Sequence, residues 1–129
     1  MTQTVWKLPV PATALVRGPA LSVLPRRRCM LSMSIELNDG KEGTLGLSFD
    51  GVEAFMCTYL TSLTLEMVEL AYGKLIEFSP SDWLGRLSKD HQRPGRPAAL
   101  KHFMICFDDG PCFEFICTSF EVLADKPSE

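Results

Sequence analysis

The chain has 129 residues, of which 46% are apolar and 22% are charged, and its formal net charge is −3. This length fits one domain with one core, and the composition is that of an ordinary globular protein. No stretch approaches the roughly 18 apolar residues that a membrane-spanning helix needs. These properties exclude a membrane-spanning protein and a strongly basic nucleic-acid-binding protein.

The charge is unevenly distributed along the chain. Residues 1–35 contain five basic and no acidic side chains, so residues 36–129 contain 8 basic against 16 acidic ones, a formal charge of −8. An acidic body is repelled by phosphate backbones. The distribution therefore argues against nucleic acid as a partner and favours a basic protein.

The five cysteines are an odd number and contain no C-x-x-C pair. This pattern fits neither a paired disulfide framework nor a zinc site, and each cysteine lies in an apolar run, where a free thiol behaves as a small hydrophobe. We therefore expect a cytoplasmic protein without a metal or a cofactor.

Residues 1–28 form a basic segment with prolines at positions 9, 11, 19 and 25. One or two extra strands (Val5 to Leu8 and Ala20 to Leu24), a targeting peptide, or an upstream extension would each fit this composition. The prolines disfavour the amphipathic helix of a targeting peptide. We predict a single α+β domain over residues 29–123 and a frayed tail over residues 124–129.

Two strands are predicted from alternating apolar residues, one over residues 31–37 and one over residues 44–49. An odd loop from Asn38 to Glu42 keeps their apolar residues on one face. Asp50-Gly51 then has the composition of a two-residue hairpin turn. This turn predicts that the next strand pairs with the second one, with Gly46 opposite Phe55.

Two helices are predicted after residue 60. Apolar residues recur at helical spacing over residues 64–74, with Ser62 or Thr64 as the N-cap. A second, short helix begins at Pro80 with Ser79 as its cap and runs towards Lys89.

The last predicted element is a hairpin from Leu100 to Phe107 and from Cys112 to Val122. Both of its faces are largely apolar, which is typical of strands at the centre of a sheet. If Phe107 faces Cys112, His102 lies opposite Cys117. The chain is thus predicted to be an α+β protein: an antiparallel meander of about five to seven strands with two short helices inserted before the C-terminal hairpin.

No catalytic motif is present in the sequence. We therefore hypothesise a non-enzymatic protein-binding module that resembles immunity or adaptor proteins only in charge and size. Its candidate binding residues are Asp108 and Asp109 in an acidic turn, and Glu114, a carboxylate among apolar strand residues.

Two alternatives remain open. A small enzyme or ligand-binding domain would have a pocket between sheet and helices, with His102, Cys117, Tyr59 and Tyr72 as candidate residues besides Glu114. A homodimer would form through the strand face that carries Phe55, Cys57 and Tyr59.

Overall fold

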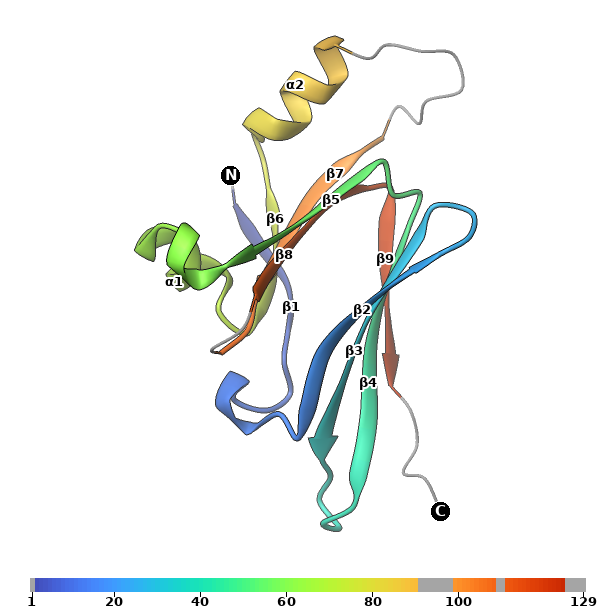
Figure 1. Cartoon of the computed structure of the whole chain (residues 1–129), viewed down its shortest axis with the longest axis vertical. Helices are drawn as coiled ribbons and strands as arrows, with labels where there is room; N and C mark the ends of the chain where they lie inside the picture. The colour runs from blue at the N-terminus through green and yellow to red at the C-terminus, as the bar shows by residue number, and fades with distance from the viewer. Residues whose placement is uncertain (1, 91–98, 109–110, 125–129) are drawn as a thin grey trace.

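The computed structural model describes residues 2–90, 99–108 and 111–124, and these form two antiparallel sheets and two α-helices (Figure 1). The α+β class is confirmed, but the nine strands form two sheets and not one meander. The five-stranded sheet has the order β1 (Gln3–Lys7), β6 (Lys74–Phe78), β7 (Lys101–Cys106), β8 (Pro111–Cys117) and β5 (Ala54–Tyr59). The four-stranded sheet has the order β2 (Arg17–Leu24), β3 (Arg28–Glu36), β4 (Glu42–Asp50) and β9 (Ser119–Ala124).

The basic N-terminal segment supplies one strand to each sheet, as the extra-strand interpretation expected. Strand β1 pairs with β6, and β2 pairs with β3. Ion pairs join this segment to the acidic body, with N–O distances of 3.1 Å for Arg17–Glu42, 2.7 Å for Arg27–Glu53 and 2.9 Å for Arg28–Asp50. The basic segment is therefore part of the fold. The limits of the domain stay a prediction. Residues 125–129 of the predicted tail lie outside the described residues.

Strands β3 and β4 form the hairpin that the alternating residues predicted. Met33 lies opposite Leu45, Leu31 opposite Leu47 and Cys29 opposite Phe49. The connecting loop is odd in length, so all six side chains lie on one face, where they are nearly or fully buried.

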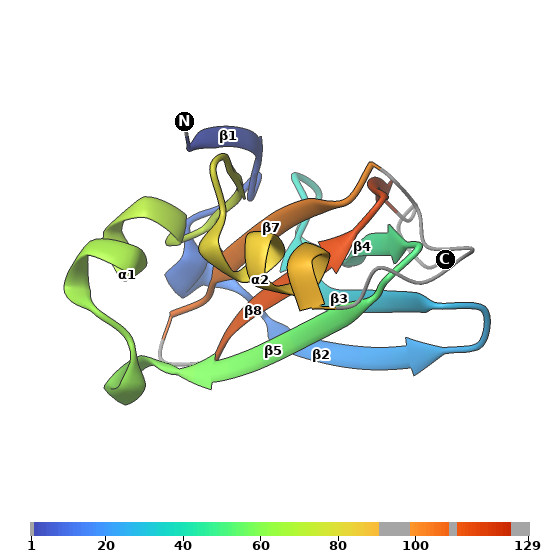
Figure 2. The same ribbon diagram turned by 90° about the horizontal axis from the view of Figure 1, so that it is seen from above.

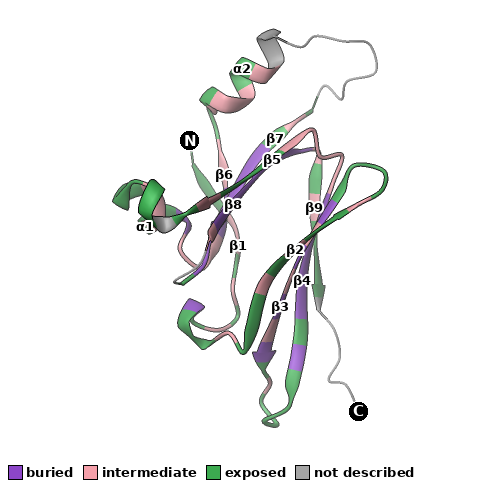
Figure 3. Ribbon diagram, viewed as in Figure 1, coloured by how far each residue is buried: buried purple, intermediate pink, exposed green. Residues whose placement is uncertain are grey.

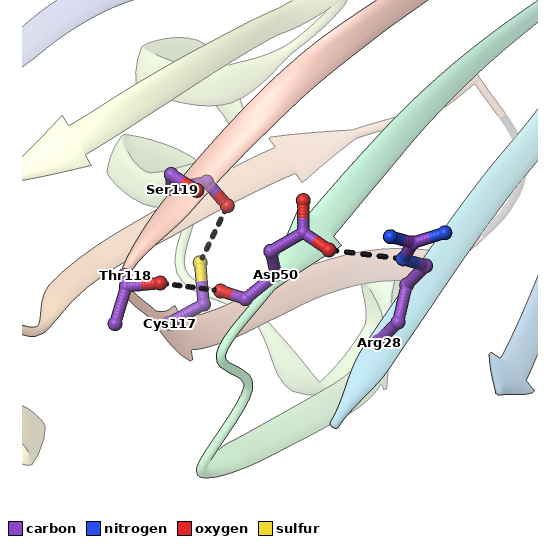
Figure 4. Close-up of polar contacts among 5 residues, drawn as sticks. All are labelled: Arg28, Asp50, Cys117, Thr118 and Ser119. Atoms are coloured by element: carbon purple, nitrogen blue, oxygen red, sulfur yellow. Dashed lines mark hydrogen bonds and ion pairs between the residues drawn. The ribbon is translucent and has the colours of Figure 1, made fainter. Parts of the chain in front are cut away.

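The predicted β4–β5 hairpin is wrong, because Asp50-Gly51 is a corner between the two sheets. Strand β4 pairs with β3 and β9, whereas β5 pairs with β8. Thr118 donates both its backbone N–H and its hydroxyl to the Asp50 carbonyl, at 3.0 and 2.9 Å (Figure 4). Gly51 has a φ of 65°, a conformation that favours glycine and that occurs in hairpin turns and, here, in a corner between two sheets.

The main core lies between the two sheets. The rings of Phe49 on β4 and Phe115 on β8 stack with centroids 3.9 Å apart, and Phe103 on β7 packs beside them. Figure 3 shows the buried residues concentrated along β3, β4, β7 and β8. We call the side of the five-stranded sheet that faces this core its inner face, and the opposite side its outer face.

The two helices, α1 (Leu65–Ala71) and α2 (Asp82–Asp90), lie on the outer face, away from the four-stranded sheet (Figure 1). They do not follow one another directly, since strand β6 separates them. The sequence predicts that the first helix continues to residue 74, whereas α1 ends at Ala71 and β6 begins at Lys74. Leu75 and Ile76 of β6 are both apolar and buried, so no alternation of polar and apolar residues marks this strand in the sequence.

The caps of the helices confirm one prediction and correct another. The Thr64 side chain accepts a hydrogen bond from the Met67 N–H at 3.1 Å, as predicted for a cap of α1. Helix α2 is capped by Ser81, whose hydroxyl accepts from the Leu84 N–H at 3.1 Å. Ser79 is therefore not the cap, and the helix begins two residues later than predicted.

The predicted C-terminal hairpin forms from β7 and β8, but its second strand ends at Cys117, because Ser119–Ala124 is β9 of the other sheet. The β7–β8 register is also shifted by one residue from the prediction. His102 lies opposite Ile116, and Cys106 lies opposite Cys112. His102 and Glu114 consequently share the outer face, whereas Cys117 lies on the inner face. The predicted His102–Cys117 pair is wrong because Phe107 belongs to the connecting loop and not to the pairing.

Cys106 and Cys112 form a disulfide bond between adjacent strands. Cys29, Cys57 and Cys117 are free thiols. The cysteine pattern therefore no longer argues for a reducing environment, and the cytoplasmic location stays a prediction. Neither α1 nor α2, the α-helices in the described ranges, has the length and apolarity to cross a bilayer.

Candidate functional site

A pocket of about 630 Å³ lies on the outer face, between the sheet and the helices. Figure 2 shows α2 passing over the sheet near β8, with α1 to one side. The walls are mainly apolar, with Met56 from β5, Met67 from α1, Phe78 from β6 and Trp83 from α2. Its polar lining consists of Ser81, Asp82, Arg86, His102 and Glu114.

Three of these polar residues form one hydrogen-bonded chain. The Glu114 Oε1 lies 2.9 Å from His102 Nε2, and His102 Nδ1 lies 2.6 Å from the Ser81 Oγ. His102 is only 6% exposed and Glu114 only 5%. In the part of the polypeptide that the structure describes, no buried side-chain nitrogen or oxygen lacks a partner. The hydrogen bonds therefore satisfy the buried imidazole of His102 and the buried carboxylate of Glu114.

When Glu114 is ionised and His102 is neutral, hydrogen-bonding chemistry gives these hydrogen bonds a single direction. An ionised carboxylate only accepts, so His102 Nε2 carries a proton and donates it to Glu114. In the neutral imidazole Nδ1 is then an acceptor, and it accepts the hydroxyl proton of Ser81. The Ser81 oxygen in turn accepts the Leu84 N–H, so the serine uses both its donor and an acceptor site.

The sheet register and two aromatic rings fix the position of the imidazole. His102 and Glu114 lie diagonally across β7 and β8, since Glu114 is opposite Met104 and His102 is opposite Ile116. The Phe78 ring lies 4.7 Å from the imidazole, and the Trp83 ring meets it edge-on at 5.2 Å. The imidazole is thereby held with one nitrogen towards the serine and the other towards the carboxylate.

Sequence reasoning identified two members of this chain but did not bring them together. In the sequence Glu114 is a carboxylate among apolar residues, yet the predicted register places it on the face opposite to His102. The sequence pattern predicts Ser79 as the helix cap, so it does not point to Ser81. The two cysteines carried a usable signal, because pairing Cys106 with Cys112 sets the register that unites His102 with Glu114.

Cys117, predicted for the same pocket, lies away from it on the inner face. It is fully buried, and its thiol donates to the Ser119 carbonyl at 3.6 Å (Figure 4). Burial raises the pKa of the Cys117 thiol to about 12, so the thiolate is absent at neutral pH. A nucleophilic role for this cysteine has no geometric support.

The two predicted tyrosines also lie outside the pocket. The Tyr72 hydroxyl donates to the Asp108 carboxylate at 2.7 Å, and this hydrogen bond raises the pKa of Tyr72. Tyr72 lines a second pocket of about 290 Å³ beside Lys7 and Lys74, whereas Tyr59 is 65% exposed and lines neither pocket.

Asp108 and Glu114, two of the three predicted partner-binding residues, do not form one surface. Asp108 is exposed, but Glu114 is buried in the lining of the outer-face pocket, and Asp109 lies outside the described residues. Within the described ranges, no group of three or more His, Cys, Asp or Glu side chains is placed to hold a metal ion. No family model, curated protein or solved structure shows a significant match to the chain.

Proposed function

We propose that this chain is a small ligand-binding domain whose ligand occupies the outer-face pocket. The supporting observation is the buried Ser81–His102–Glu114 chain in the lining of that pocket. Burying a carboxylate and an imidazole costs stability, and apolar residues of similar volume fill such positions equally well or better. A polar chain at this position is explained by a ligand that uses it.

The lining indicates the chemical class of the ligand. The Phe78, Trp83 and Met67 side chains offer an apolar surface for an aromatic or alkyl group. Arg86 is exposed at the pocket and offers a guanidinium to an anionic group. We therefore propose an amphipathic small molecule with one apolar part and one anionic or strongly polar part.

Fluorescence of Trp83 tests this proposal. Substituting Trp6, the other tryptophan, by phenylalanine leaves Trp83 as the single reporter. 8-Anilinonaphthalene-1-sulfonate, an aromatic anion, is the probe, and we expect saturable one-to-one binding with energy transfer from Trp83. Arg86→Ala weakens this binding, while Arg17→Ala, which alters an exposed ion pair in the other sheet, leaves it unchanged. Binding that is unaffected by Arg86→Ala would contradict the proposed site.

A protein-binding function is the second candidate, because strand β5 is an edge strand with exposed apolar residues. Phe55, Met56 and Tyr59 are 43%, 40% and 65% exposed, and among the described strands only β8 pairs with β5. Exposed apolar side chains on a free strand edge favour association. Self-association through Phe55, Cys57 and Tyr59 predicts a dimer in light scattering that Tyr59→Ser weakens, and a monomer mass would exclude it.

A basic protein partner stays a proposal that the acidic charge of the chain supports. Affinity capture from the native lysate at low and high salt, compared with the Asp108→Lys, Asp109→Lys variant, tests it. Salt-insensitive capture, or capture unchanged by the charge reversal, would count against this partner class.

A further inference from the structure

The Ser81–His102–Glu114 chain has the connectivity of an activated nucleophile. One imidazole nitrogen accepts the serine hydroxyl at 2.6 Å, and the other nitrogen donates to a buried carboxylate at 2.9 Å. A carboxylate in this position keeps the basic nitrogen directed at the serine and stabilises the imidazolium that forms when the serine loses its proton. All three side chains line the same apolar pocket.

We propose that this site is an esterase site in which Ser81 is the nucleophile and His102 is the general base. This inference rests on the proposed function, because the ester must occupy the outer-face pocket. The apolar walls accept the acyl group, and Arg86 faces the polar alcohol part. The substrate class is a carboxylic ester of an apolar acid.

The reaction runs in two balanced steps. In the first, the Ser81 Oγ bonds to the ester carbonyl carbon, its proton passes to His102 Nδ1, and the carbon–oxygen bond to the alcohol breaks as the alcohol takes that proton. In the second, a water molecule bonds to the acyl carbon and gives a proton to Nδ1. The bond from the carbon to Oγ then breaks, Oγ recovers the proton, and the carboxylic acid leaves.

The first turn of α2 adds donors beside the nucleophile. The Leu84 N–H is bonded to the Ser81 hydroxyl oxygen and the Gly85 N–H to the Ser81 carbonyl. The N–H groups of Asp82 and Trp83 have no backbone or side-chain acceptor among the described residues. These two N–H groups directly follow Ser81 in the chain, and in the proposed reaction they are the donors to the negative oxygen of the tetrahedral intermediate.

Two assays of the full chain test the chemistry. One measures hydrolysis of 4-nitrophenyl butyrate, and the other measures labelling by an alkyl fluorophosphonate, which transfers its phosphonyl group to an activated serine with loss of fluoride. We expect hydrolysis above the background rate and one label, located on Ser81 by mass spectrometry. A label on another residue would overturn the assignment of the nucleophile.

The variants separate catalysis from helix capping. Ser81→Ala removes both the hydroxyl and the cap, whereas Ser81→Asn retains a capping side chain without a nucleophilic hydroxyl. In both Ser81 variants we expect the rate of hydrolysis to fall by about 100-fold or more and the label to be absent. Ser79→Ala, two residues away and outside the pocket lining, retains both. Full activity in Ser81→Asn would overturn the inference.

Glu114 is a positioning residue, and its test uses a different readout. Glu114→Gln still accepts from Nε2 but lacks the charge, so kcat falls by about 100-fold or more while KM changes little. Equal changes in both constants would indicate a purely structural role. Saturable binding of the naphthalene sulfonate probe without hydrolysis or labelling would overturn the esterase inference and leave the proposed function standing. Loss of binding as well would overturn both.

Discussion

The two faces of strands β7 and β8 differ in chemistry although both are buried. The inner face carries Phe103 and Phe115, which pack with Phe49 in a wholly apolar core. The outer face carries Met104 and the disulfide beside the buried His102–Glu114 pair. The apolar packing of the inner face is explained by its contribution to stability. The buried polar groups that the same two strands carry on the outer face call for a functional explanation.

The largest predicted effect is a cavity on the inner face. Phe115→Ala removes a fully buried ring that stacks on Phe49, and we expect it to lower the free energy of unfolding by about 3–5 kcal/mol. Urea denaturation measures this loss. Binding of the naphthalene sulfonate by the folded fraction stays intact, because the ring is on the face opposite the pocket. A loss below about 1 kcal/mol would contradict the assigned core.

The outer face responds to single and double substitutions in opposite ways. Glu114→Leu alone leaves the His102 N–H buried without an acceptor and lowers the free energy of unfolding by about 1–3 kcal/mol. Replacing His102 by leucine as well restores most of that loss, because no fully buried polar group then remains unpaired and the partly exposed Ser81 hydroxyl can donate to water instead of to His102. Ligand binding is lost in both variants. A double variant that binds as tightly as the original chain would refute the functional reading of this face.

The pH dependence of stability sharpens the description of the inner face. The folded chain keeps the Cys117 pKa near 12, above its ordinary value of 9.0, so the unfolded chain loses this proton first as the pH rises. Stability is therefore full below pH 9 and falls above it, by about 1.4 kcal/mol at pH 10 from this thiol. Cys117→Ala removes this part of the slope, and Cys57→Ala, at an exposed position, does not.

The smallest predicted effect concerns the exposed acidic turn. Asp108→Ala removes the hydrogen-bond acceptor and the charge that oppose ionisation of the Tyr72 hydroxyl, so the pKa of Tyr72 falls towards its ordinary value. Absorbance titration in a Tyr59→Phe background isolates this hydroxyl, since the chain has two tyrosines. An unchanged titration would show that the hydrogen bond does not form in solution.

Local patterns predicted the elements of this fold better than its long-range pairing. The alternation around Met33 and Leu45 predicted β3 and β4, and Thr64 predicted the start of α1. Asp50-Gly51 was misread because a positive φ serves a sheet-to-sheet corner as well as a hairpin. Strand β6 was hidden by burial on both faces, which removes alternation from the sequence.

The candidate site depended on the pairings that local patterns do not determine. A shift of one residue between β7 and β8 moves every side chain to the other face, and that shift separated His102 from Glu114. Ser81 joins them only because α2 begins two residues later than the proline at position 80 indicated. The residue types were visible in the sequence, but their proximity required the register.

The Ser81, His102 and Glu114 side chains are proposed to form the polar part of a ligand site. Long-range ¹H–¹⁵N NMR of the imidazoles tests this role directly, because the chain contains two histidines and His91 serves as an internal reference. We expect neutral His102 to carry its proton on Nε2, and we expect added naphthalene sulfonate to shift the His102 resonances in a saturable way. A proton on Nδ1, or saturating probe without a His102 shift, would contradict the account.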